Sequence, residues 1–300
     1  MNKKRQAPIV DSADSGAAAS APPSSSDVLR AEPKESLQKQ TVPMNAKEEL
    51  GDLFRTALIA VLLAVIIRTF LFEPFNIPSG SMKPTLLVGD YLFVNKPAYG
   101  YSRYSFPFGL APIEGRVWAK EPQRGDVVVF KLPTNPSIDY IKRVIGLPGD
   151  TIQVRRGQLY INGKAVPRET VGLKEVSGPD GFEGSMMEYI ETLPGGIMHR
   201  IYEESDNGEL DNTEEFTVPE GHYFMMGDNR DNSQDSRVTS LVGFVPFDNL
   251  VGRADILFFS IDESASLFQP WKWPMDIRYS RILDRIGPVR PDKETPAAEE

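Results

Sequence analysis

The order of apolar and polar positions divides the chain into a polar start, one long apolar segment and a region of short alternating runs. Residues 1–50 are rich in Ala, Ser, Pro, Lys and Glu and carry few bulky apolar side chains. Such a segment buries too little apolar surface to offset the entropy lost when a chain becomes ordered. The pattern predicts a disordered N-terminal tail over residues 1–50.

The apolar segment that follows is long enough to cross a membrane. Leu53 to Phe72 is mostly apolar, and a helix of that length is about 30 Å long, which is the thickness of a bilayer's hydrocarbon core. We therefore expect one transmembrane helix over residues 51–73. A buried helix of a soluble protein is the alternative. A cleaved secretory signal is disfavoured because a long polar segment precedes the apolar one and no small-x-small site follows it.

Basic residues are unequally distributed on the two sides of this segment. Lys34, Lys39, Lys47 and Arg55 lie on its N-terminal side, whereas Lys83 is alone in the comparable stretch that follows. Positive charge is enriched on the cytoplasmic side of membrane spans. The expected topology is a single pass with a cytoplasmic N-terminus and the rest of the chain on the extracytoplasmic side.

Short runs of β-forming residues fill the chain after the apolar segment. Turns such as Asn162-Gly163-Lys164 separate these runs, without helical periodicity between them. The expected strands are Tyr91–Asn95, Asp126–Lys131, Asp139–Val144, Thr151–Arg155, Gln158–Ile161, His222–Met226 and Arg253–Ser260. The pattern predicts a mostly β domain of antiparallel sheets over residues 74–286, followed by a polar C-terminal tail over residues 287–300.

Composition narrows the chemistry that this domain can perform. A formal net charge of −9 argues against a nucleic-acid-binding protein, which is usually basic. The absence of cysteine excludes a disulfide, a thiolate nucleophile and a cysteine-ligated metal. His199 and His222 are the only histidines, so a lysine or carboxylate is the expected acid-base group.

The acidic charge is concentrated in residues 168–220. This segment holds 14 Asp and Glu residues against Arg168, Lys174 and Arg200. Its net negative charge exceeds that of the whole chain, which indicates an inserted lobe whose acidity is solvated. The pattern assigns no function to the lobe.

Aromatic and basic residues alternate near the C-terminus. Leu267 to Ile286 contains Trp271, Trp273 and Tyr279 among several Arg and Lys residues. Trp and Tyr beside cations are typical of a surface that rests on a membrane interface. An ordinary core element with a basic face explains them equally well.

The first segment with the residues for chemistry is Ile77-Pro-Ser-Gly-Ser-Met-Lys-Pro-Thr-Leu86. Two prolines restrict its backbone, and Gly80 separates two serines. In an extended chain Ser79 and Ser81 lie on the same side, so one hydroxyl could attack a carbonyl while the other donates to the oxyanion. A turn-stabilising serine pair is the alternative.

The second segment, Asp139-Tyr-Ile-Lys-Arg-Val-Ile-Gly-Leu-Pro-Gly-Asp150, places Lys142 inside an apolar strand. Alternation puts Lys142 and Arg143 on opposite faces, so one of them faces the better-covered side. Desolvation lowers the pKa of a lysine and turns the amine into a usable base. The alternative is an edge strand with both cations in water.

The third segment, Met226-Gly-Asp-Asn-Arg-Asp-Asn-Ser-Gln-Asp-Ser-Arg237, is dense in polar side chains. Asp231, Ser233 and Asp235 partly fit the alternate spacing of a calcium loop, but no Glu closes it as in an EF-hand. A network that supports a catalytic lysine is as plausible, with Asp235 paired to Arg237 and Ser233 hydrogen-bonded to the lysine.

Taken in order behind a membrane anchor, the three segments resemble the conserved boxes of the bacterial type I signal peptidases. The resemblance covers most of residues 70–282 and includes Gly243-Phe-Val-Pro and Leu250-Val-Gly-Arg253. It implies a mostly β catalytic domain with an inserted second lobe over residues 168–220. It also implies a membrane-bound serine endopeptidase that removes signal peptides from secretory precursors.

The resemblance assigns roles residue by residue. It implies that Ser81 is the nucleophile, that Lys142 is the general base, and that the Ser79 hydroxyl and the Ser81 N–H form the oxyanion hole. Ser233 would orient Lys142, and Asp235 and Arg237 would form a structural ion pair. The implied substrate-binding residues are Phe75, Ile77, Pro78, Met82, Leu86, Tyr140 and Ile141.

The same resemblance implies the partners and the location. The reaction needs neither metal nor cofactor, and the expected partners are secretory precursors and membrane lipid, not nucleic acid. The expected location is the bacterial cytoplasmic membrane, with the catalytic domain on the periplasmic side. Lys83, two residues after the nucleophile, is a second candidate base. A self-cleaving Ser-Lys peptidase and an inactive membrane-anchored binding protein remain alternative functions.

Overall fold

The computed structural model describes residues 46–106, 109, 112–177, 183–262, 265, 271 and 273–287. Residues 1–45 of the predicted disordered tail lie outside the described residues, as does the polar tail beyond residue 287. The predicted bound at residue 50 is wrong, because residues 46–50 are already helical and continue into the apolar segment. Residues from Asp52 onward form one compact unit.

A long helix, α1 (Ala46–Phe70), contains the predicted membrane span. The portion Glu49–Phe70 has a mean hydropathy of 2.2 and is long and apolar enough to cross a bilayer. None of its most apolar window is buried against the protein. This exposure disfavours the alternative of a buried soluble helix, because such a helix would pack its apolar side chains against the rest of the domain.

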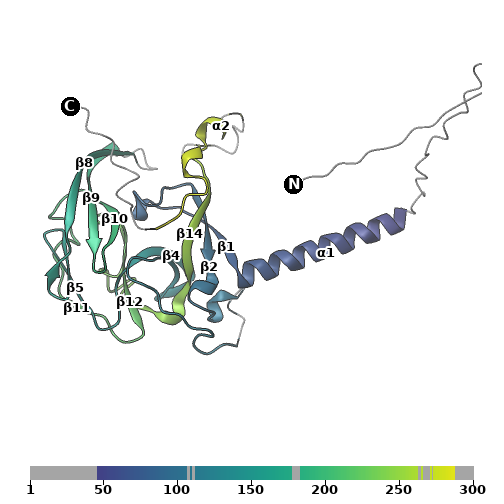
Figure 1. Ribbon diagram of the computed structural model, residues 1–300, viewed down its shortest axis with the longest axis horizontal. Helices are drawn as coiled ribbons and strands as arrows, with labels where there is room; N and C mark the ends of the chain where they lie inside the picture. The colour runs from purple at the N-terminus through teal and green to yellow at the C-terminus, as the bar shows by residue number, and fades with distance from the viewer. Residues whose placement is uncertain are drawn as a thin grey trace, which may run out of the picture. The chain divides into compact units, whose positions relative to one another are not determined.

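The largest sheet has seven strands in the order β1-β2-β14-β3-β4-β12-β13. In Figure 1, β14 lies between β2 and β4, the strand that contains Lys142. The strand bounds are β1 (Phe72–Asn76), β2 (Asp90–Asn95), β3 (Val127–Leu132), β4 (Asn135–Gly146), β12 (His222–Met226), β13 (Val245–Pro246) and β14 (Leu250–Ser260). β4 lies between β3 and β12, and its second half, residues 141–146, is buried.

Two smaller sheets complete the domain (Figure 1). The first has the order β11-β5-β6-β7, and an Asn162-Gly163 turn with positive φ at both residues joins β6 to β7, as the hairpin prediction requires. The second has the order β10-β9-β8. Their bounds are β5 (Thr151–Arg155), β6 (Gln158–Ile161), β7 (Lys164–Ala165), β8 (Arg168–Ser177), β9 (Glu183–Leu193), β10 (Ile197–Glu203) and β11 (Phe216–Thr217).

Helices are few and short after α1. Within the described residues they are α2 (Trp273–Asp276) and single 3₁₀ turns at Gly80–Met82, Lys96–Ala98, Arg103–Ser105, Phe247–Asn249 and Tyr279–Arg281. The strand pairings among the named strands are antiparallel. The predicted mostly β fold with antiparallel sheets is confirmed.

Buried apolar residues form three clusters that fix the sheets against one another. One cluster lies beneath the first serine motif and includes Ile77, Met82 and Leu86 with residues of β2, β3 and β14. A second packs β5 and β6 against β12, and a third packs β3 and β12 against the segment around Val245. Alternate residues of each strand supply these clusters, in keeping with the period of two.

The prediction that the acidic side chains of residues 168–220 are exposed to solvent is wrong for four of them. Glu188, Glu191, Glu203 and Asp211 are each at most 3% exposed. The reason is that alternate residues of β9 and β10 are buried and carry ion pairs, for example between Glu191 and Arg230, while Asp211 is buried in the loop that follows β10. Charge counting does not distinguish a paired buried carboxylate from a solvated one.

Large apolar side chains near the C-terminus are exposed. Trp271, Met275 and Tyr279 are 69%, 87% and 62% exposed, which disfavours the interpretation of this stretch as a core element. The nearby cations are held by carboxylates, since Arg278 pairs with Asp262 and Arg281 with Asp90. Contact with a membrane interface stays a prediction.

Candidate active site

The first serine motif forms a tight turn on top of the core. Ser79 precedes the 3₁₀ turn Gly80–Met82, which places the Ser79 and Ser81 hydroxyls 3.4 Å apart. Ser81 is buried, whereas Ser79 is exposed. The extended backbone at Ser79, with φ −130° and ψ 153°, gives the two hydroxyls the shared side that the sequence indicates.

Lys142 enters the same place from the middle of β4. Its Nζ lies 2.6 Å from the Ser81 Oγ, and its side chain is 3% exposed. Burial lowers the pKa of Lys142 to about 8, although Asp235 and Asp228 act in the opposite direction. A neutral amine is therefore accessible near neutral pH, which is what a lysine base needs.

Both cations of the second motif are buried. The structure pairs Lys142 with Val128 of β3 in register, and Arg143 with Val127 on the same strand. Arg143 is only 1% exposed. The alternative of an edge strand with both cations in water is wrong, because β4 has a neighbouring strand on each side.

The third motif supports the serine turn from behind. The Asn229 backbone N–H donates to the Ser81 carbonyl oxygen at 3.1 Å, and the Asn229 side-chain amide donates to the Gly80 carbonyl oxygen at 3.1 Å. A Cβ on Gly227 would come within 2.5 Å of the Ser81 carbonyl oxygen, so this close approach requires glycine. A residue nearly 150 positions away thus helps to fix the position of the serine turn.

The third motif also contains a buried ion pair. The Arg237 guanidinium donates two hydrogen bonds to the Asp235 carboxylate, both at 2.9 Å, and the Gly227 N–H donates to the same group. Burial opposes ionisation of Asp235, but the charge and hydrogen bonds of Arg237 outweigh it and lower the pKa of that carboxyl. Asp235 therefore remains charged beside Lys142.

Ser233 is buried close to this pair, but it does not make the expected hydrogen bond to Lys142. Its hydroxyl lies close enough to the Asp235 carboxylate to help lower the pKa of that group. The hydroxyl lies against the backbone of Gly227 instead, in the space that a Cβ there would fill. Its orienting role stays a prediction that requires a rotation of the Ser233 side chain.

A second buried ion pair, which the sequence interpretation did not single out, lies one residue from the lysine. Arg143 binds the Asp228 carboxylate through two hydrogen bonds at 2.8 and 2.6 Å, and the Thr85 hydroxyl also donates to Asp228. Both charged residues are 1% exposed. The pair joins the first motif to the second and third. In the sequence, the pair was indicated only by the presence of Arg143 in the second motif and of Asp228 in the third.

The residues implied to bind substrate differ in exposure. Met82 and Leu86 are fully buried, and Ile77 and Ile141 belong to the same core cluster. Phe75 and Tyr140 are partly exposed, and Pro78 is exposed. The three exposed or partly exposed residues therefore offer open surface near the serine turn. The four buried residues form the apolar base beneath it.

The second candidate base, Lys83, is also buried. It is 8% exposed and follows directly after the 3₁₀ turn, with its backbone N–H bonded to the Gly80 carbonyl oxygen. The side chain runs back past Gly80, because a Cβ placed there would contact its Cδ and Cε at 3.5 Å. The contact to the Ser81 hydroxyl found in the structure comes from Lys142.

Comparisons with known proteins identify the family of this chain. The profile of the family described as "Signal peptidase, peptidase S26" matches residues 50–259. Signal peptidase I of Rickettsia typhi is 46% identical over 243 residues, which cover 78% of this chain and 87% of that protein. Signal peptidase I of Rickettsia prowazekii is 43% identical over 253 residues, with 82% and 91% coverage. The crystal structure of a signal peptidase I from Enterococcus faecalis is 31% identical, covers 45% of this chain and 97% of that one, and has a TM-score of 0.27.

Proposed function

Because the chain belongs to the peptidase S26 family of signal peptidases, we propose that it removes signal peptides from secretory precursors with Ser81 as nucleophile and Lys142 as general base. Family membership makes the protein a serine endopeptidase. The observation that carries the assignment of residues is the 2.6 Å contact between the Lys142 Nζ and the Ser81 Oγ in a buried site.

The proposed reaction begins with proton transfer. Neutral Lys142 accepts the Ser81 proton as the Ser81 Oγ attacks the scissile carbonyl carbon. The Ser79 hydroxyl, 3.4 Å from the Ser81 Oγ, and the Ser81 N–H donate to the oxygen that becomes negative. Protonated Lys142 then gives its proton to the leaving amine as the peptide bond breaks.

The second half of the reaction restores the enzyme. A water molecule gives a proton to Lys142 and attacks the acyl carbon, and the bond to the Ser81 Oγ breaks as that oxygen regains the proton. Asp235 and Asp228 favour the charged form of the lysine, but burial outweighs them and keeps the pKa of Lys142 at about 8. The lysine therefore alternates between its two protonation states at little cost, as a general base must.

The membrane helix supports the proposed substrate. Only nine residues separate Phe72 from Ser81, so the nucleophile lies within about 30 Å of the end of the apolar segment. A signal peptide in the bilayer presents its cleavage site at that height. We propose a cytoplasmic N-terminus and a periplasmic catalytic domain. The basic residues Lys34, Lys39, Lys47 and Arg55 lie on the N-terminal side of the apolar segment, whereas the comparable stretch after it has only Lys83, and positive charge is enriched on the cytoplasmic side of membrane spans.

The first prediction concerns the cleavage site. Full-length protein in detergent should cleave a secretory precursor once, after a small-x-small sequence, because such a sequence precedes the cleavage site of a secretory signal. Mass spectrometry of the new N-terminus checks this. A precursor with Phe in place of the last small residue should be cleaved at least about 100-fold more slowly. Equal cleavage of both precursors would contradict the proposed specificity.

The second prediction concerns pH. Because the base must be neutral and burial sets the pKa of Lys142 at about 8, cleavage should be fastest above that pH. Below it the rate should fall about tenfold per pH unit, since each unit lowers the neutral fraction by that factor. Initial rates at precursor concentrations well below KM, from pH 5 to 9, measure the curve, because kcat/KM reports the pKa of the free enzyme. A rate independent of pH down to about pH 5 would exclude a lysine base.

A further inference from the structure

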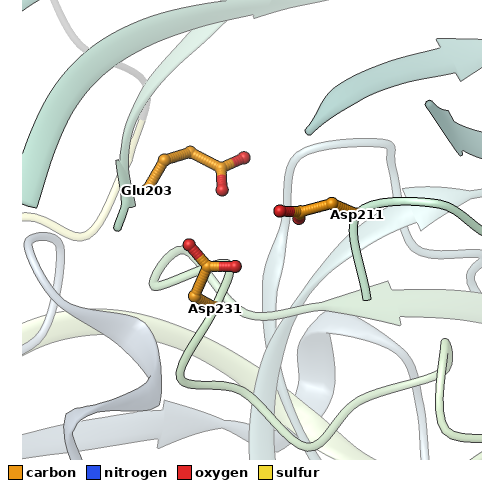
Figure 2. A group of neighbouring side chains, drawn as sticks. All are labelled: Glu203, Asp211 and Asp231. Atoms are coloured by element: carbon orange, nitrogen blue, oxygen red, sulfur yellow. The ribbon is translucent and has the colours of Figure 1, made fainter. Parts of the chain in front are cut away.

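Three carboxylates outside the candidate active site converge on one point. Glu203 lies at the end of β10, Asp211 in the loop that follows, and Asp231 in the third motif. One oxygen of each lies within 4.8 Å of the others. Figure 2 shows the three carboxylates pointing toward one another from three different segments of the chain.

The backbone is shaped to hold two of these groups. One oxygen of Asp231 accepts hydrogen bonds from the N–H groups of Glu204 and Ser205, at 2.7 and 3.1 Å. One oxygen of Asp211 accepts from the Gly208 N–H at 2.6 Å. A Cβ on Gly208 would come within 2.6 Å of the other Asp231 oxygen, so glycine keeps this space open for the carboxylates.

The remaining oxygens are buried without a partner. Glu203 Oε2 and Asp211 Oδ1 accept no hydrogen bond, although their side chains are only 2% and 0% exposed. A buried charged acceptor without a partner is strongly unfavourable. Both oxygens belong to carboxyl groups that converge in Figure 2, which points to a ligand between these groups.

Neighbouring cations do not supply that ligand. Arg168 lies 3.6 Å from Glu203 but forms its shorter contact, 2.8 Å, with Asp206. Arg230 donates to both oxygens of Glu191, and Arg237 is engaged by Asp235. The charge of the three carboxylates is therefore only partly compensated by the described residues around them.

We propose that Glu203, Asp211 and Asp231 bind a divalent cation, with Ca²⁺ as the best fit. Carboxylate oxygens are the ligands that Ca²⁺ prefers, and at its bond length of about 2.3–2.6 Å two ligand oxygens lie up to about 5 Å apart. The separations of at most 4.8 Å fall within that reach. Ca²⁺ also accepts the backbone carbonyls and waters that would complete its coordination.

Such an ion would connect the acidic segment to the candidate active site. Asp231 precedes Ser233 and Asp235, and the Arg230 N–H already bonds to the Tyr202 carbonyl oxygen. The cation would add a second connection between the end of β10 and this motif. The site is distinct from the calcium loop of Asp231, Ser233 and Asp235 considered from sequence, because Asp235 is paired with Arg237.

A proton is the competing occupant. Burial raises the pKa of Glu203 to about 9, with Asp231 and Asp211 acting in the same direction and Arg230 and Arg168 opposing. A protonated Glu203 would reduce the charge by one and could donate one hydrogen bond. It would leave the site without affinity for Ca²⁺, so a binding measurement distinguishes the two occupants.

The third prediction is the test of this site. Full-length protein in detergent, freed of metal with a chelator, is titrated with CaCl₂ in a calorimeter. We expect one saturable site per chain with a dissociation constant below about 1 mM, the weak end of protein calcium sites. Glu203→Gln should weaken binding at least tenfold because it removes one charged ligand, whereas Glu209→Gln, an exposed neighbour in the same loop, should leave it unchanged.

Thermal unfolding provides the second readout. Calcium should raise the unfolding midpoint of the wild type and Glu209→Gln, and should raise that of Glu203→Gln less at the same concentration, because only a folded site binds the ion. If Glu203→Gln fails to fold, Asp231→Asn serves in its place. Absence of saturable binding by the wild type up to about 5 mM calcium, or equal binding by the charge-removing variant, would overturn the proposal.

Discussion

Replacing Lys142 by Met or Ser81 by Ala is expected to lower the rate of precursor cleavage by at least about 10³-fold. Lys142→Met preserves most of the side-chain volume in the buried site but removes the amine that lies 2.6 Å from the Ser81 Oγ. Ser81→Ala removes the attacking oxygen itself. Because the two groups act as a unit, the double variant should be no slower than either single variant. Single-turnover assays with the same precursor measure all three.

Lys83→Ala is the matched control for this prediction. Lys83 is also a buried lysine, at 8% exposed, and it lies two residues from the nucleophile. The variant should retain cleavage, since the contact to the Ser81 hydroxyl comes from Lys142. Loss of cleavage in a folded Lys83→Ala together with activity in Lys142→Met would mean that the base has been misassigned.

Precursor binding separates the peptidase from an inactive binding protein. Both Lys142→Met and Ser81→Ala should bind precursor as the wild type does, because neither residue is among those expected to form the substrate surface. An enzyme loses turnover in these variants while binding persists. A wild type that binds precursor but never cleaves it, under conditions in which its fold is intact, would favour the binding protein.

Several β-strands in two of the sheets could be predicted from local sequence. The runs Thr151–Arg155, Gln158–Ile161 and His222–Met226 are the strands β5, β6 and β12 with the same bounds. Their alternating apolar residues and the turns between them contain the necessary information within a few positions. Fold class followed from the same signal, because hairpin turns without intervening helices leave antiparallel pairing as the solution.

The acidic segment shows where such reasoning fails. Residues 168–203 form the strands β8, β9 and β10, none of which was expected. Because carboxylates occupy many of their positions, these strands lack the alternation of apolar residues that identifies a strand. Glu191 and Glu203 are nevertheless buried. The ion-pair partner of Glu191 is Arg230, which is far away in the sequence. A charge that is paired only in the folded chain cannot be recognised from its neighbours in sequence.

The candidate site shows the same limit in a different form. The three motifs each contain residues suited to catalysis, and family resemblance proposes their roles. Neither source contains the distance between Ser81 and Lys142, which are 61 residues apart. That distance depends on long-range connections such as those from Asn229 to the serine turn and from Arg143 to Asp228. The second of these connections carries the largest expected effect on stability.

Arg143→Met is expected to lower the free energy of unfolding by about 3–5 kcal/mol, the cost of leaving one charge of a buried pair without its partner. Asp228 would keep only the Thr85 hydroxyl of the contacts described above, in a position that is 1% exposed. Arg143→Lys should recover only part of the loss, because an ammonium group cannot reproduce the two parallel hydrogen bonds of the guanidinium. Denaturant unfolding of full-length protein in detergent measures the three free energies.

Arg253→Met provides the matched control for this pair. Arg253 binds Asp255 at 2.6 Å, the same length as the shortest Arg143–Asp228 contact, but its side chain is 40% exposed. Water therefore replaces the lost partner, and the expected cost is at most about 1 kcal/mol. Replacing Arg143 and Asp228 together by apolar residues should cost less than the sum of the two single replacements, because no unpaired charge remains. If Arg143→Met costs no more than Arg253→Met, the buried pair is not what fixes the serine turn to the sheet.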